Sequence, residues 1–96
     1  ARSIPMKLAI AKRRSKRLAA GTVSYADSLK VWYLTLYGVT NGTAHPFGAS
    51  PFDNSDAAIA EGNDVLKVAE GDWIEIDESD VTAYIESNTR NRWDVK

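Results

Sequence analysis

Apolar residues recur with helical spacing over residues 24–37, and this is the strongest pattern in the chain. Ser24 and Asp27 have the spacing of a capping box, and Gly38 follows as a stop signal. The apolar positions fall at i, i+4, i+7, i+8, i+11 and i+12, and they are Tyr25, Leu29, Trp32, Tyr33, Leu36 and Tyr37. The spacing predicts an aromatic-rich amphipathic helix.

A strand is the competing interpretation for the second half of this stretch. Residues 31–40 are rich in β-branched and aromatic side chains, and Asn41-Gly42 is a strong hairpin turn pair. A strand here would place bulky apolar groups on both of its faces, so it would need cover on both sides. We therefore favour the helix.

The first 21 residues predict a second helix with a narrow apolar face. Ser3 is a candidate cap, Pro5 suits a first turn and Gly21 is a natural end. Two of the five residues on the apolar face are small or polar, and the face consists of Ile4, Leu8, Ala11, Ser15 and Leu18. We expect residues 1–21 to form a basic N-terminal helix or arm beside a body formed by residues 22–96.

The rest of the chain predicts short elements. Turn-forming dipeptides over residues 40–54 indicate an irregular loop, and residues 55–61 indicate a helical turn ended by Gly62. Two strands at 65–68 and 73–76 would form a hairpin. Ser79 or Asp80 would cap a short helix through Glu86, with three side chains turned inward, Val81, Tyr84 and Ile85. The predicted fold is a small single α+β domain.

Composition excludes several classes of protein. The 96 residues contain no Cys, which excludes disulfides, thiolate zinc sites and thiol nucleophiles. No apolar run approaches 18 residues and no signal peptide is recognisable, so we expect a soluble domain, intracellular or within a virus particle.

Charge is divided unevenly along the chain although the total is only −1. Residues 1–30 hold eight bases and one acid, and residues 31–96 hold four bases and twelve acids. Such a division produces local potentials that attract oppositely charged surfaces. It indicates a protein that works by contact with something else.

The basic run between residues 7 and 17 is the main candidate contact segment. Its density of cations suits phosphates or an acidic protein surface, and it consists of Lys7, Lys12, Arg13, Arg14, Lys16 and Arg17. The alternative is that these residues form a solvent-exposed surface with no binding role. Further candidates for protein contact are the loop aromatics Phe47 and Phe52, and Trp93 with its neighbours Arg90 and Arg92.

Catalysis finds little support in the sequence. His45 is the only histidine, and neither a G-x-S-x-G sequence nor a phosphate-binding glycine loop is present. The acids of the second half lack the spacing of a calcium loop. We expect no enzyme, cofactor, metal site, small-molecule substrate or membrane contact.

Two functions remain open. The first is a structural or assembly subunit that contacts copies of itself or neighbouring chains, of the kind that capsid or head-tail components of virus particles represent. The second is a non-specific nucleic-acid-binding protein that uses the segment 7–17.

Overall fold

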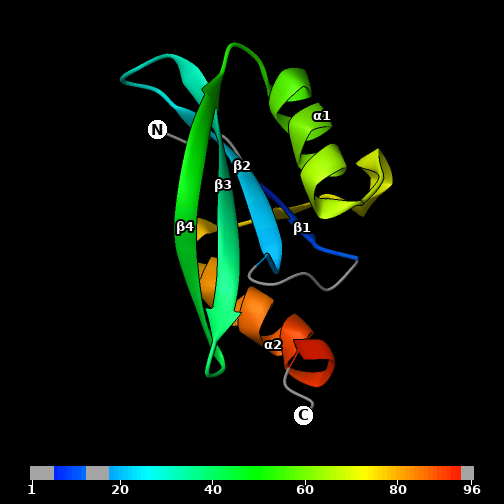
Figure 1. Cartoon of the computed structure of the whole chain (residues 1–96). Coiled ribbons are helices and arrows are strands. Elements are labelled where there is room, and N and C mark those ends of the chain that lie inside the picture. The colour runs from blue at the N-terminus through cyan, green and yellow to red at the C-terminus, as the bar shows by residue number, and fades with distance from the viewer. Residues whose placement is uncertain (1–5, 13–17, 94–96) are drawn as a thin grey trace.

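Five antiparallel strands form one sheet in the order β4-β3-β2-β1-β5, and two helices pack against it (Figure 1). The computed structural model describes residues 6–12 and 18–93. The strands are β1 (Met6–Ile10), β2 (Ala20–Ala26), β3 (Val31–Thr40), β4 (Thr43–Phe52) and β5 (Ile74–Ile76). The helices are α1 (Ser55–Leu66) and α2 (Val81–Trp93), with 3-10 turns η1 (Glu70–Asp72) and η2 (Glu78–Asp80). The α+β class is confirmed.

The aromatic-rich helix predicted over residues 24–37 is wrong, because this segment forms most of β2 and β3. Tyr25 pairs with Trp32 across the two strands, and their rings lie 5.1 Å apart. Leu34 packs with Ala58 of α1 on one face, whereas Tyr37 packs near α2 on the other. β3 thus packs against both helices, and on its α2 face the cover is confined to the part near Tyr37.

The helix predicted at the N-terminus is also wrong in its described part. Residues 6–10 form β1, which lies between β2 and β5 inside the sheet. Leu8 is buried toward α2, and Ala9 and Ala11 are buried toward α1. The expected boundary at residue 21 falls inside β2, and residues 1–5 and 13–17 lie outside the described part.

The irregular loop expected over residues 40–54 is a strand for most of its length. Asn41 and Gly42 have φ values of 55° and 79°, and both signs suit the two-residue hairpin turn that joins β3 to β4. β4 contains Pro46 and Pro51, which strands tolerate at an edge because proline has no N–H to donate. The hairpin interpretation of the Asn-Gly pair is therefore correct.

The C-terminal half agrees better with its predictions. α1 extends past Gly62 to Leu66, so the expected strand at 65–68 is wrong, and Lys67 ends the helix with a φ of 60°. β5 confirms the strand expected at 73–76. α2 begins at Val81 as expected and runs beyond Glu86, with Val81 and Ile85 buried and Tyr84 half-buried.

Each helix covers a different face of the sheet. α1 lies over β2 and β3, where Ala58 meets Val23 and Leu34 and where Leu66 meets Ala9 and Ala11. α2 lies on the other face near the β3–β4 turn, over buried residues of three strands, and this core consists of Leu8, Ala19, Ala20, Ala44, Val81 and Ile85 (Figure 1). The small residues on the strands allow both helices to approach the sheet closely.

Trp73 packs against α1 at a point where only glycine leaves room. A Cβ on Gly62 would lie 2.7 Å from two carbon atoms of the Trp73 ring. The indole Nε1 donates a 2.7 Å hydrogen bond to Oδ1 of Asn63, which holds the ring in this position. Gly62 is therefore a packing requirement inside the helix.

We predict that Gly62→Ala destabilises the protein by about 1–2 kcal/mol in urea unfolding followed by circular dichroism, because overpacking outweighs the gain in helix propensity. Gly48→Ala is the matched control, since a Cβ there meets nothing within 4 Å, and it should leave stability unchanged or raise it slightly. A Gly62→Ala protein as stable as the wild type would contradict the packing account.

Candidate functional site

The strand pairing on the outer side of β1 stops before β1 ends. Leu8 pairs with Ile74, and Trp73, the residue before β5, is extended and packs with Ala9, Ala11 and Leu66. The 3-10 turn η1 directly precedes Trp73, so the pairing begins only at Ile74. β1 continues to Ile10. The last part of its outer edge therefore has no strand beside it among the described residues.

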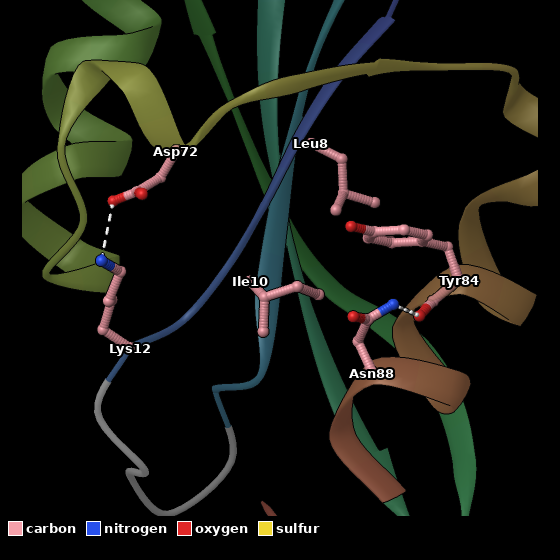
Figure 2. A pocket seen from close by; sticks show the side chains of 6 residues that line it. All are labelled: Leu8, Ile10, Lys12, Asp72, Tyr84 and Asn88. Carbon is pink, nitrogen blue, oxygen red and sulfur yellow. Dashed lines mark hydrogen bonds and ion pairs between the residues drawn. The ribbon is translucent and has the colours of Figure 1, made fainter.

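A hollow of about 190 Å³ lies at this point of the sheet edge (Figure 2). β1 supplies an apolar wall, η1 closes one end, and α2 closes the other. The residues that line it are Leu8, Ile10, Lys12, Asp72, Tyr84 and Asn88. The hollow thus combines a short apolar surface with polar groups from three separate segments.

An ion pair closes one end of the hollow. Nζ of Lys12 lies 3.3 Å from Oδ2 of Asp72, and the same oxygen accepts a 2.8 Å hydrogen bond from the N–H of Ala69. The Ala69 N–H and then the Lys12 ammonium hold the pKa of Asp72 below its usual range. The carboxylate is thus ionised at neutral pH and neutralises Lys12, so this end of the hollow carries no net charge.

Two uncharged polar side chains form the other end. Nδ2 of Asn88 donates a 2.8 Å hydrogen bond to the carbonyl oxygen of Tyr84 one turn earlier in α2, which fixes the amide. The Tyr84 ring crosses the hollow with its hydroxyl toward Leu8 (Figure 2). The hollow therefore offers neutral donors and acceptors.

The backbone of Ile10 faces the unpaired side of β1. The N–H of Ala11 donates to the carbonyl oxygen of Ala19 at 2.8 Å, which makes Ile10 and Ala20 a pair without mutual hydrogen bonds. The N–H and C=O of Ile10 consequently point away from β2, toward the side where β5 has already stopped. No described residue pairs with them.

The opposite edge of the sheet is closed. The N–H of Ala44 on β4 donates a 2.8 Å hydrogen bond to Oε2 of Glu86 from α2. Pro46 and Pro51 remove two further donors from the same strand. β4 is therefore a poor template for another strand.

A second surface lies on the α2 face of the sheet, beyond the part that α2 covers. Its residues are cross-strand neighbours on β2, β3 and β4, are half-buried or exposed, and carry no charge, and we call them the open face: Ser24, Tyr33, Thr35, Ala49 and Pro51. At the border of the open face nearest α2, the Tyr37 hydroxyl is hydrogen-bonded to Thr22, and burial raises the pKa of Tyr37. The described residues provide no element over the open face.

The described residues include only part of the predicted basic run. Lys7 is exposed on β1 and opposite Glu75 of β5 in register, whereas Lys12 lies beyond the strand at the hollow. The remaining four bases fall outside the described residues, and they are Arg13, Arg14, Lys16 and Arg17. In sequence they connect β1 to β2, so the basic run is not one helix face.

The predicted contact aromatics have different positions. Phe47 lies on β4 beside an irregularity in strand register and is 48% exposed. Phe52 is half-buried and packs against the core under α1. Arg90, Arg92 and Trp93 belong to the last turns of α2, but their side chains lie outside the described part.

Sequence reasoning missed the residues of the hollow except Lys12. Ile10, Tyr84 and Asn88 come together only because β1 is a strand and α2 crosses it. The mispredicted N-terminal helix concealed this arrangement. A useful signal was the continuous apolar run around Leu8, which is typical of a strand buried on both faces.

The described part of the chain shows no arrangement of side chains for catalysis by His45 or for metal binding. His45 is exposed on β4, with Nε2 3.0 Å from Oγ1 of Thr40. Within residues 6–12 and 18–93, no three His, Asp or Glu side chains gather as metal ligands. Among these same residues, neither helix has the length and apolar character needed to cross a membrane.

Comparison of the chain with family models, with curated proteins and with solved structures found no match. The functional argument therefore depends on the geometry of the hollow, the open face and the basic segment.

Proposed function

We propose that this protein is a non-enzymatic structural or assembly subunit that contacts other copies of itself through the open face. The observation that carries the proposal is an uncharged, partly exposed half of a sheet face with no described element over it. Interface cores are depleted in charge and enriched in aromatic residues, and this surface has Tyr33 at its centre. A small accessory or capsid-type component of a virus particle is the kind of assembly that this architecture suits.

The chemistry of the open face suits contact between identical copies. A two-fold interface joins the same surface patch of both copies, so a patch with one sign of charge would repel itself. The open face has no such penalty. The hydroxyl groups of Ser24, Tyr33 and Thr35 both donate and accept hydrogen bonds, so they can pair across a symmetric contact.

We predict that the protein's mass rises above that of the monomer with increasing concentration in size-exclusion chromatography with light scattering. Ala49→Glu should return it to a monomer, because a symmetric contact would bring two carboxylates together. Ser50→Glu is the matched control, since Ser50 is exposed beside Ala49 but belongs to the opposite face of the sheet. A wild type that stays monomeric at high concentration in both low and high salt would refute the proposal.

A nucleic-acid-binding protein is the second candidate. The observation in its favour is that the basic segment joins two neighbouring strands inside the sheet, while Lys12 at its start is 59% exposed at the side chain. The cations of this segment would contact phosphates without reading sequence.

We predict for this candidate that affinity for single-stranded DNA falls steeply with salt in fluorescence anisotropy. Replacing Arg13, Arg14 and Arg17 by Ala should reduce the log-log salt slope by roughly 2 to 3, because each phosphate contact contributes about 0.7 to 0.9. A Lys30→Ala, Lys67→Ala double variant controls for general loss of charge. Equal retention of DNA by the wild type and the triple variant would remove this candidate.

A further inference from the structure

The turn between β3 and β4 places an asparagine directly before a glycine at the end of the hairpin (Figure 1). Asn41 and Gly42 are both exposed, and their φ values of 55° and 79° are those of a type I′ turn. A Cβ added at Gly42 would meet no atom of a residue beyond its chain neighbours within 4 Å. The backbone nitrogen of Gly42 is therefore covered neither by a side chain of its own nor by a packed element.

The side-chain amide of Asn41 differs from the other three asparagine amides in the described part of the chain. Those three amides are each held by a hydrogen bond of 2.7 or 2.8 Å, and they belong to Asn54, Asn63 and Asn88. No residue within 6–12 and 18–93 bonds the amide of Asn41. Of these four asparagines, only Asn41 combines an unbonded amide with a following glycine.

An unbonded asparagine amide beside a glycine can react with its own main chain. The glycine nitrogen attacks Cγ of the asparagine and loses its proton to water, a C–N bond forms, and the side-chain nitrogen leaves as ammonia. Water then opens the resulting five-membered succinimide at either carbonyl carbon. One opening gives aspartate, and the other gives isoaspartate, in which the main chain runs through Cβ and Cγ. Since both reacting groups belong to one chain, the step needs no enzyme.

We propose that Asn41 is a site of spontaneous deamidation, through attack of the Gly42 nitrogen on its side chain. In a type I′ turn ψ of the first residue is about +30°, which holds the next nitrogen away from Cγ. The turn must therefore open locally before the ring closes, and hairpin ends open at low cost. The folded chain consequently reacts more slowly than a free peptide of the same sequence. The inference does not depend on the proposed assembly function.

The two products have different consequences for the sheet. Aspartate keeps the number of main-chain atoms and tolerates positive φ as asparagine does, so the turn persists. Isoaspartate adds one main-chain carbon between Thr40 and Thr43, the last pair of the hairpin, and a two-residue turn does not accommodate it. Ala44 follows directly, is buried under α2 and donates its N–H to Glu86. Isoaspartate therefore weakens the contact between β4 and α2.

The first test is incubation of the full-length chain at mildly alkaline pH and body temperature, beside a peptide of residues 39–44. Mass spectrometry of proteolytic fragments follows the gain that replacement of an amide by a carboxylic acid produces. The fragment with Asn41 should show this gain about tenfold more slowly than the peptide, because the turn must open first. Asn54 is the matched control, since it is also exposed but its amide caps α1 and a serine follows it. Its fragment should stay unchanged.

The second test separates the two products by chromatography and unfolds each in urea, followed by circular dichroism. Methylation by isoaspartyl methyltransferase identifies the isoaspartate form. This form should unfold at a lower urea concentration than the untreated chain, whereas the variant Asn41→Asp should unfold close to the untreated chain. The variant carries the same added charge, so the difference between the two reports the extra main-chain carbon.

Three results would overturn the inference. The first is an unchanged Asn41 fragment over a period in which the peptide converts completely. The second is a gain at Asn54 as fast as that at Asn41, which would show that the turn and its unbonded amide do not select the site. The third is equal unfolding of the isoaspartate form and Asn41→Asp, which would contradict the assigned effect on the hairpin.

Discussion

The packing of Trp73 against Gly62 holds the chain that leads into β5 against α1. The Trp73 ring occupies the α1 face, where Gly62 leaves room for it and where Asn63 accepts its indole N–H. Trp73 is extended and packs with Ala9 and Ala11, and the 3-10 turn η1 directly precedes it. β5 is therefore only three residues long, and the edge of β1 beyond Leu8 has no partner strand among the described residues. The hollow lies where η1 and α2 meet this edge.

The two edges of the sheet differ in consequence. The β4 edge is ten residues long but is closed by two prolines and by the hydrogen bond from Ala44 to Glu86. The β5 edge is short and leaves Ile10 available. Long unprotected edges invite unspecific pairing with other chains. The closed β4 edge limits such pairing on that side of the sheet.

The division of charge along the sequence has a different meaning in the folded chain. In sequence, the basic residues between positions 12 and 17 stand between β1 and β2, two inner strands of the sheet. Lys12 is already paired with Asp72. The acidic half of the sequence thus supplies a partner for the basic segment within one chain.

The sequence predicted the elements whose signals are local. The Asn41-Gly42 turn, the strand at 74–76 and the start of α2 at Val81 follow from turn chemistry, β-branched content and capping residues.

The segments around Leu8 and Leu34 could not be assigned in this way. Both strands carry apolar side chains on both faces, so they lack the alternation that marks a half-exposed strand, and the apolar spacing over 24–37 also fits a helix. Their identity depends on α1 and α2, which cover them from distant parts of the chain. The candidate site was hidden for the same reason, because it needs β1, η1 and α2 together.

Amide hydrogen exchange in the free protein, measured residue by residue along β1 by NMR, tests most directly whether the strand pairing stops at Leu8. The structure predicts that the amide of Ile10 exchanges nearly as fast as an exposed amide, while those of Leu8 and Ala11 are protected by orders of magnitude. Protection of Ile10 equal to that of Ala11 would show that this edge is already paired, and it would contradict the open edge.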